Sequence, residues 1–406
     1  MARSWSRASV LLLAFGSILP AASAAARPVD FVRTEVVSPI PANPVSSGSR
    51  LLRALAGITG ASATDPYLIK IEPGLYDLDG RSLVMRPFID IEGSGEGVTI
   101  VQSTVNAVGT VQGADHAELR RLTVVNQTAV NGIALANAAA GFSASHVTCL
   151  ALGGSSSSTA LVNSATGGGT FLDMTLRAEG RSATGASLRG GLLSRSRAFA
   201  SGDEFAYGVF NAASAGEIVD VTAEAVGDSY ATAVRNEAGG PLLRNVRASG
   251  HGADISEGIV NGGGSAARIQ GAVIEVSGGT SFASGIRNEF SSAQISDATI
   301  TVDAPTSAFG VSSIFSGTPA LRGVTLRVTA GGHGVGVRSD RTQVTVESST
   351  ITADRFSLVN DFGSATTSIQ VGASRLEGAV QAGDGTLRCA ASYDQAFAPL
   401  SAGCTP

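Results

Sequence analysis

The sequence is poor in charged residues, in aromatic residues and in lysine. Charged residues make up 15% of the 406 residues, and Lys70 is the only lysine. Without Arg3 and Arg7 near the N-terminus, 26 basic residues stand against 33 acidic ones, a net charge of about −7. Because no basic cluster remains, nucleic acid is a poor candidate partner. Aromatic residues are 5%, and the only tryptophan is Trp5. This scarcity argues against a tight glycan site built on aromatic rings.

Long apolar runs are also missing. After residue 26 no segment has 18 apolar residues in a row, so we expect no membrane span. Residues 1–26 are predicted to be a signal peptide. Arg3 and Arg7 are followed by the short apolar run Val10–Leu19 and by the small residues Ala22–Ala24. The chain is therefore expected to be exported and to be secreted or periplasmic.

Cysteine is scarce, with three residues in the chain. Cys389 and Cys404 lie fifteen residues apart near the end of an exported chain, and we expect a disulfide between them. Closing a loop of this length stabilises a fold by about 3 kcal/mol. Cys149 lies in an alternating stretch. A buried, inert thiol is the expected state, and a reactive thiol is the alternative.

A repeat occupies most of the remaining sequence. An apolar residue and a variable one are followed by Asp, Asn or Gly and then by alternating apolar residues. The gaps between these hinge positions are 25 or 26 residues, apart from one of 47, which leaves a missing member near Arg195. Arg121 and His146 stand at the hinge position of two earlier repeats. The hinge positions are Asp173, Asp220, Asn245, Gly271, Asp297 and Gly323.

This repeat predicts a coil of short strands. Period-2 alternation gives each strand one buried face, and Asp, Asn and Gly permit the bends between strands. One unit cannot bury its apolar face alone, so identical units must stack. We therefore predict an all-β fold, a right-handed parallel β-helix of roughly ten coils. The helix predicted at Ser49–Leu55, with Ser49 as a candidate N-cap, would form a short N-terminal cap.

The predicted organisation has five parts. Residues 1–26 form the signal peptide and residues 27–49 an irregular, proline-rich lead-in. Residues 50–115 contain the cap and the first coils, and residues 116–365 contain the repeats of about 25 residues. Residues 366–406 form the last coil and a disulfide-closed tail.

Asparagine recurs at one position of the repeat. In Val234–Glu237, alternation directs Val234 and Asn236 inward and Arg235 and Glu237 outward. We expect the asparagines to stack as an inward amide ladder with a structural role, continued by serines at 313 and 339. The predicted members are Asn163, Asn211, Asn236, Asn261, Asn288 and Asn360.

Charged residues recur on the outward side in alternate coils, with Val260 and Ser312 between them. One interpretation is a solvated salt-bridge pattern that keeps the sheet from pairing with others. The other is a charged groove wall that binds a polar polymer. The weak ligand-binding candidates are Arg235, Glu237, Arg287, Glu289, Arg338 and Asp340.

Two stretches carry a resemblance to a known family. Tyr67–Leu78 (YLIKIEPGLYDL) and Met85–Ile100 (MRPFIDIEGSGEGVTI) resemble the opening coils of pectinesterase-like proteins of the pectin lyase fold. The stretch Ser368–Val380 resembles their closing coil, so the likeness extends over most of residues 50–406. It implies an exported bacterial β-helix protein. Pectinesterases act through two aspartates, but the comparable coils here, Ala151–Asn163 and Leu176–Leu188, contain no Asp. No family catalytic residue can therefore be carried over.

Weaker chemical signals remain. Asp115 and His116 lie in the densest polar cluster, and a His–carboxylate pair can act as a general base. Pectate lyases combine Ca²⁺-binding acids with an arginine, which makes the charged columns a weak candidate for Ca²⁺. However, carboxylates in alternate coils would lie about 10 Å apart, too far to share one ion. No metal site and no other cofactor is predicted.

The leading hypothesis is an exported, non-catalytic β-helix protein that presents a polar face to a polysaccharide or a cell-surface component. The alternative is a polysaccharide-active enzyme, a lyase, hydrolase or esterase with an atypical site. A third hypothesis is a fibre unit similar to a phage tailspike. The predicted signal peptide argues against it.

Overall fold

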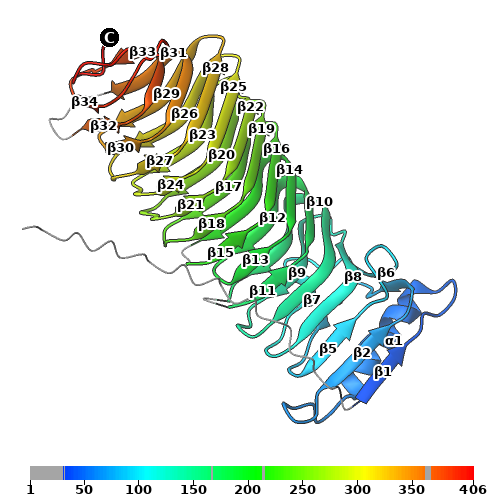
Figure 1. Ribbon diagram of the computed structural model, residues 1–406. Helices are drawn as coiled ribbons and strands as arrows, with labels where there is room; N and C mark the ends of the chain where they lie inside the picture. Colours follow the sequence, from blue (N-terminus) through cyan, green and yellow to red (C-terminus); the bar gives the residue numbers. More distant parts are fainter. Residues whose placement is uncertain (1–30, 32, 166–167, 213–214, 362–366) are drawn as a thin grey trace, which may run out of the picture.

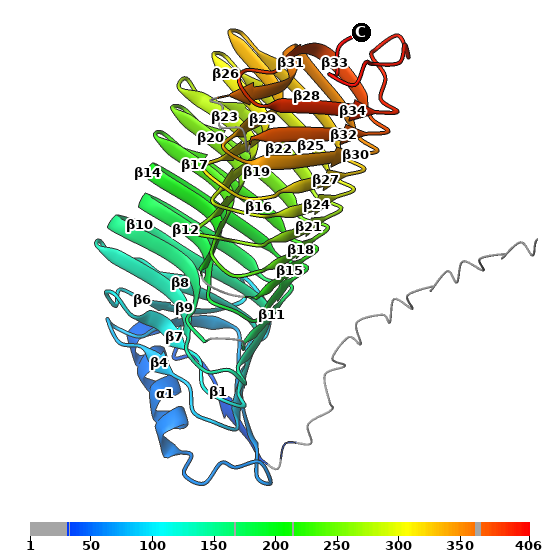
Figure 2. The same cartoon turned by 90° about the vertical axis from the view of Figure 1, so that its left-hand side faces the viewer.

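The computed structural model describes residues 31, 33–165, 168–212, 215–361 and 367–406. The predicted signal peptide lies outside the described residues. The described chain forms a parallel β-solenoid of about 12 turns, close to the ten coils expected from the sequence (Figures 1 and 2). Its all-β class is confirmed, and its parallel crossovers agree with a right-handed β-helix. No helix in the described part is long and apolar enough to cross a membrane.

The strands of each turn lie on three faces of the solenoid, with a bend between one face and the next. The first face carries short strands, each paired in parallel with the equivalent strand of the next turn. Its strands are β1 (Arg33–Val37), β2 (Tyr67–Ile71), β5 (Ile89–Glu92), β11 (Thr170–Leu172), β13 (Leu192–Ser194), β15 (Glu217–Val219), β18 (Leu242–Arg244), β21 (Arg268–Gln270), β24 (Gln294–Ser296), β27 (Ala320–Arg322), β30 (Gln343–Glu347), β32 (Ser368–Gly372) and β34 (Thr386–Ala390).

The second and third faces follow in each turn, and in several turns one strand continues from face to face. The second face has β3 (Gly74–Asp77), β6 (Thr99–Ser103), β16 (Thr222–Gly227), β19 (Arg247–Gly252), β22 (Val273–Gly278), β25 (Thr299–Ala304) and β28 (Thr325–Ala330). The third face has β4 (Leu83–Val84), β7 (Gly109–Gln112), β9 (Asn131–Asn137), β17 (Tyr230–Glu237), β20 (Ile255–Gly262), β23 (Phe282–Glu289), β26 (Ser307–Ile314) and β29 (His333–Asp340). Strands that span faces are β8 (Glu118–Asn126), β10 (Ser143–Asn163), β12 (Thr175–Leu188), β14 (Arg197–Ala212), β31 (Thr350–Asp361) and β33 (Arg375–Gln381).

From β11 to β32, a left-handed residue follows each first-face strand and turns the chain onto the second face. This confirms the hinge positions predicted from the repeat, and Arg195 (φ 48°) is the missing member. Asp and Asn at these positions tolerate the left-handed region and also bond to one another. Asn245, for example, donates to Asp220 Oδ1 over 2.9 Å, and Arg195 donates to both carboxylate oxygens of Asp173.

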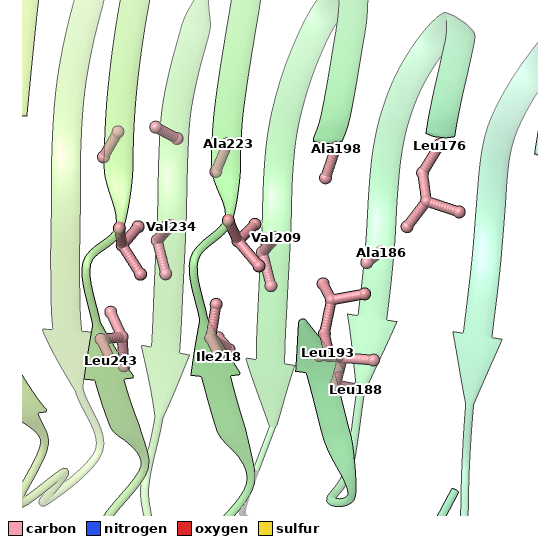
Figure 3. Close-up of a cluster of buried hydrophobic side chains, with 14 of the residues drawn as sticks. Leu176, Ala186, Leu188, Leu193, Ala198, Val209, Ile218, Ala223, Val234 and Leu243 are labelled. Atoms are coloured by element: carbon pink, nitrogen blue, oxygen red, sulfur yellow. The ribbon is translucent and has the colours of Figure 1, made fainter. Parts of the chain in front are cut away.

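Stacked apolar side chains from the three faces fill the interior (Figure 3). Leu193, Ile218 and Leu243 form one column from the first face and are fully buried. Opposite them the third face contributes Val209 and Val234. Because each turn repeats the same inward positions, every side chain packs on its own equivalent in the next turn, and the core is continuous.

One position on the third face must be small. A Cβ atom added at Gly310 would lie 2.5 Å from the Cδ atoms of Leu326 on the second face. Gly285 and Gly258 hold the same position in the two preceding turns, where an added Cβ would lie 2.3 Å from the Cγ2 atoms of Ile300 and Ile274. The third face therefore approaches the second closely at this point, and a larger side chain would not fit there.

The N-terminal cap differs from its prediction. The helix α1 runs from Pro44 to Gly57, and its N-cap is Asn43, whose Oδ1 accepts a hydrogen bond from Ser46 N at 3.0 Å. Ser49 is therefore not the cap. Proline is well placed in the first turn because its missing N–H would have no partner there. The helix packs closely on β3, since a Cβ at Gly48 would lie 1.9 Å from Asp77 O.

The structure places the repeated asparagines in one inward column of the third face. Asn236 donates to Asn261 over 2.8 Å, and Asn261 donates to Asn288 over 2.9 Å. Asn211 donates to Asn236 at 3.4 Å, and Asn288 donates to Ser313 at 3.2 Å. All these side chains are buried.

The column is interrupted below Asn211. Leu188 occupies the position between Asn163 and Asn211, so Asn163 bonds instead to the carbonyls of Gly168 and Gly190. Asn137 precedes Asn163 in the column and donates to its Oδ1 at 2.8 Å. At the other end of the column, Asn360 donates to Thr386 O at 3.3 Å.

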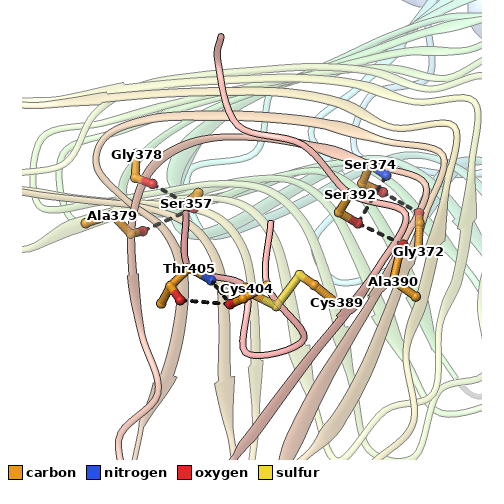
Figure 4. The surroundings of a disulfide bond; sticks show 11 residues. Ser357, Gly372, Ser374, Gly378, Ala379, Cys389, Ala390, Ser392, Cys404 and Thr405 are labelled. Carbon is orange, nitrogen blue, oxygen red and sulfur yellow. Dashed lines mark hydrogen bonds between the residues drawn. A yellow bond between two sulfur atoms is a disulfide. The ribbon is translucent and has the colours of Figure 1, made fainter. Parts of the chain in front are cut away.

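The C-terminal tail closes the end of the solenoid. Cys389 and Cys404 form the predicted disulfide, with their Cα atoms 5.0 Å apart (Figure 4). Cys389 N also donates to Ala402 O at 2.9 Å. Nearby, Ser374 and Ser392 each donate to the carbonyl two residues before them, which continues the backbone bonding into the last turn.

Replacing Asn261 by alanine tests the asparagine column. The change removes two amide bonds and leaves the Asn236 donor and the Asn288 acceptor buried without partners. We expect the free energy of unfolding to fall by about 3 kcal/mol. Chemical denaturation followed by circular dichroism measures it. An unchanged midpoint would mean that the column contributes nothing to stability.

Candidate functional site

The predicted Asp115–His116 pair lies in an exposed turn before β8. The closest carboxylate and imidazole atoms are 3.4 Å apart, and the side chains are 53% and 61% exposed. Asp115 accepts a hydrogen bond from Gly141 N, and His116 has a left-handed backbone and stacks on Phe88. These contacts belong to a turn that joins two coils of the solenoid.

Glu118 and Arg120, on the strand that follows this pair, lie among other charged side chains. Arg120 donates to Glu92 at 2.9 Å and to Glu118 at 2.8 Å, and it lies 3.4 Å from Asp90. Lys70 pairs with Glu92. Burial raises the pKa of Asp90. Burial also opposes ionisation of Glu92, but hydrogen bonds from Lys70 and Arg120 outweigh it and lower the Glu92 pKa. Asp90 and Glu92 come from an earlier coil and were not among the predicted site residues.

Aromatic rings gather on the outward side of the third face, contrary to the expectation drawn from their scarcity. Phe205 stacks on Tyr230 with centroids 5.3 Å apart, and Tyr207 contacts Phe205 and Phe210. Further along the solenoid, rings from β23, β26, β29 and β31 form a second group with centroids 5.6–6.5 Å apart. We call the whole set the aromatic strip: Phe205, Tyr207, Phe210, Tyr230, Phe282, Phe309, His333 and Phe356.

The strip arises from register. Phe205, Tyr230 and Phe282 occupy one position of the repeat, and Tyr207, Phe309 and Phe356 occupy the position two residues further on. Seven of the eight rings belong to Phe or Tyr, in a chain with only five Tyr and fifteen Phe. The signal in the sequence was positional, and a count of aromatic residues could not show it.

The charged columns run beside the aromatic strip. Arg235 pairs with Glu237 on its own strand, as the alternation suggested. Arg287 pairs with Glu289 and, in addition, with Glu257 of the preceding turn at 3.0 Å. The third arginine, Arg338, lies 4.0 Å from Asp340 but donates to Asp361 of the following turn at 3.0 Å. Glu257 and Asp361 were not among the predicted site residues.

Glu257 is a buried charge in the middle of this face. It is 2% exposed, and its two oxygens accept hydrogen bonds from Arg287 and from Thr232, the latter at 2.9 Å. The guanidinium of Arg287 also lies over the ring of Phe282 at 5.4 Å, and that of Arg338 over Phe309 at 5.3 Å. Contacts on several sides hold these arginines, so their remaining N–H groups have defined directions.

A hollow also lies on the outward side of the first face. It has a volume of about 580 Å³ and runs along β18, β21, β24, β27 and β30. Aliphatic side chains form part of its lining, and the polar residues are Arg268, Gln270, Gln294, Ser296, Arg322, Thr345 and Glu347. A further hollow of about 500 Å³ continues it towards Arg388. Because their linings contain no ring, these hollows offer less for a sugar than the third face.

No group of three or more His, Cys, Asp or Glu side chains in the described ranges is arranged to hold a metal ion. The carboxylates of the charged columns are held by arginines instead. Cys149 is completely buried, and burial raises the pKa of its thiol far above the usual value. The environment therefore favours the inert state of this thiol over the reactive one.

These features define a parallel β-solenoid with a polar and aromatic third face. No known protein family and no curated protein matches this sequence. Solved structures share the fold. The Dettilon tailspike protein matches with a TM-score of 0.50 and 11% identity over 85% of this chain and 68% of that one.

Two carbohydrate-active proteins show weaker likeness. The mannuronan C-5 epimerase A-module from Azotobacter vinelandii has a TM-score of 0.39 and 13% identity, over 88% of this chain and 97% of that one. A pectin methylesterase in complex with a hexasaccharide has a TM-score of 0.26 and 9% identity, over 93% of each chain. At these identities the likeness concerns the fold alone.

Replacing Arg287 by methionine tests whether the Glu257 pair is a structural part of this face. The change leaves Glu257 charged and buried beside a single hydroxyl donor, and we expect a loss of about 3 kcal/mol in the free energy of unfolding. The control is Arg247→Met, because Arg247 pairs with Glu275 and both side chains are at least half exposed. The control should lose less than about 1 kcal/mol. Equal losses in urea denaturation would contradict the argument.

Cys149 should not react with Ellman's reagent in the native protein. After unfolding in guanidinium without a reductant, one thiol should titrate, because Cys389 and Cys404 remain joined. The physical reason is that the reagent attacks the thiolate, which burial disfavours. Rapid labelling of the folded chain at neutral pH would show that this part of the core opens readily.

Proposed function

We propose that this protein is exported and binds a neutral polysaccharide along its third face without turning it over. The observation that carries the proposal is the aromatic strip. A chain with few rings places eight of them on one outward surface, in two groups whose members contact one another along the axis of the solenoid. Ring faces and edges offer apolar area to the C–H surfaces of sugars, and Tyr207 and Tyr230 add hydroxyl groups.

The charges of this face favour an uncharged ligand. In the charged columns Arg235, Arg287 and Arg338, together with Arg341 beside Asp340, stand against five carboxylates. An anionic polymer would lie beside an excess of like charge, which opposes association. Hydroxyl groups of a neutral sugar can donate to these carboxylates and accept from the arginines, so one face satisfies both kinds of hydrogen bond.

Export is supported by two features. Residues 1–26 have the charge, apolar run and small residues of a signal peptide. The disulfide between Cys389 and Cys404 is of the kind that persists in oxidising compartments.

A polysaccharide-active enzyme is the second candidate, and one observation favours it. Burial raises the pKa of Asp90, while hydrogen bonds lower the pKa of the nearby Glu92. Carboxyl groups whose pKa values are driven apart can serve as acid and base. Arg120 lies among these carboxylates, however, and already bonds to Glu92 and Glu118.

The test measures binding and turnover together. Purified mature protein is titrated with neutral glucans, mannans and xylans and with anionic alginate and polygalacturonate, with Ca²⁺ or with EDTA. We expect binding to a neutral polymer that changes little between about 0.05 and 0.5 M salt, because screening acts on charge pairs. Steeply salt-dependent binding to an anionic polymer would contradict the proposal.

A double variant, Tyr230→Ala with Phe282→Ala, should weaken that binding at least about tenfold, equivalent to 1.4 kcal/mol. Phe397→Ala is the matched control, because Phe397 is 69% exposed but lies in the C-terminal tail. Products are followed by mass spectrometry. Shortened or unsaturated sugars that disappear with Asp90→Asn would establish the enzyme instead.

A further inference from the structure

A small pocket opens on the third face between the two arginines that lie over rings. Its volume is about 120 Å³, and it spans three successive turns, on β23, β26 and β29. Apolar atoms form most of its wall, and hydroxyl and guanidinium groups form the rest. The lining residues are Phe282, Ser284, Arg287, Phe309, Ser312, Ile314 and Arg338.

Ser284 supplies the polar group that marks this pocket. Its side chain is fully buried, and its hydroxyl has no hydrogen-bond partner. Its neighbour Glu257 in the preceding turn already accepts from Thr232 and Arg287. The neighbour on the other side is Phe309. A buried hydroxyl without a partner costs roughly 1–3 kcal/mol, and a bound group that completes its hydrogen bonding recovers that cost.

The size of the pocket limits its occupant. Its volume of about 120 Å³ is much smaller than the 580 Å³ of the hollow on the first face. A substituent of three or four heavy atoms fits this space. Phe282, Phe309 and Ile314 offer it an apolar contact, so part of the substituent should be a methyl group.

The charges decide the polar end of the substituent. Arg287 is shared by Glu257 and Glu289, and Arg338 by Asp361 and Asp340. Arg341 also donates to Asp340, so four carboxylates surround three arginines, and this excess of negative charge opposes a further carboxylate or sulfate. The two guanidinium groups that line the pocket likewise oppose an ammonium group. A neutral carbonyl oxygen can accept from a free guanidinium N–H and from the Ser284 hydroxyl.

We infer that this pocket is a subsite for the acetyl group of an acetylated sugar residue. The methyl group lies against Phe282, Phe309 and Ile314, and the carbonyl oxygen faces Ser284 and the arginines. An acetamido group on an amino sugar and an O-acetyl ester share this chemistry. The inference rests on the proposed function, because the remainder of the chain of sugars must lie along the aromatic strip.

The experiment compares acetylated oligosaccharides with their deacetylated forms by titration calorimetry. One arm uses N-acetylglucosamine oligomers and glucosamine oligomers, and the other uses O-acetylated and saponified mannan oligomers. The wild-type protein should bind an acetylated form at least about fivefold more tightly, as one net hydrogen bond provides. The arm in which the acetylated form binds more tightly shows whether the pocket takes an acetamido group or an O-acetyl ester.

The deciding variant is Ser284→Ala, and Ser265→Ala is its matched control. Ser265 is also fully buried with a hydroxyl that has no partner, but it does not line the pocket. Ser284→Ala should abolish the preference for the acetylated form and leave binding of the deacetylated form unchanged. Ser265→Ala should leave both unchanged.

Two outcomes would overturn the inference, and they differ. If acetylated and deacetylated forms bind equally and Ser284→Ala behaves as Ser265→Ala does, the acetyl subsite is wrong while polysaccharide binding stands. If none of these oligosaccharides and no neutral polysaccharide binds, the proposed function fails and the subsite with it.

Discussion

Parallel pairing between neighbouring turns is the constraint on which the rest of this structure depends. Each turn bonds only to the turns beside it, so the register between turns sets the position of every side chain. A slip of one residue would exchange the inward and outward sets along a whole strand. The left-handed hinge between the first and second faces and the small residue at Gly258, Gly285 and Gly310 resist such a slip, because each fits only one place in the turn.

Register also explains how a sparsely charged, aromatic-poor chain builds a distinctive surface. Long side chains on alternate turns extend over the short residues between them, so Val260 and Ser312 are buried although they point outward. Arg287 reaches the turn below it to contact Glu257, and Arg338 reaches the turn above it to contact Asp361. The surface is therefore held in place by contacts between turns, which leaves defined donors and acceptors for a ligand.

Much of the fold could be predicted because its signals are local and periodic. The hinge residues recur every 25 or so residues, and even the absent one was placed near Arg195. The helix began earlier than expected because Asn43 and Pro44 form a better start than Ser49, which hydropathy alone does not show. Leu188 was not expected in the asparagine column, since its turn, from Thr170 to Leu192, is shorter than the next one, from Leu192 to Glu217.

The sequence by itself determined the solenoid, because alternation and a repeated hinge leave a chain few other ways to bury its apolar residues. It also determined which residues point outward, Arg235, Glu237, Arg287 and Glu289 among them. Only the tertiary structure decided which outward residues meet. Glu257 meets Arg287 thirty residues away, Ser284 is buried without a partner, and rings scattered over 150 residues form one strip. Such contacts depend on the exact register and side-chain lengths of adjacent turns, which no local pattern encodes.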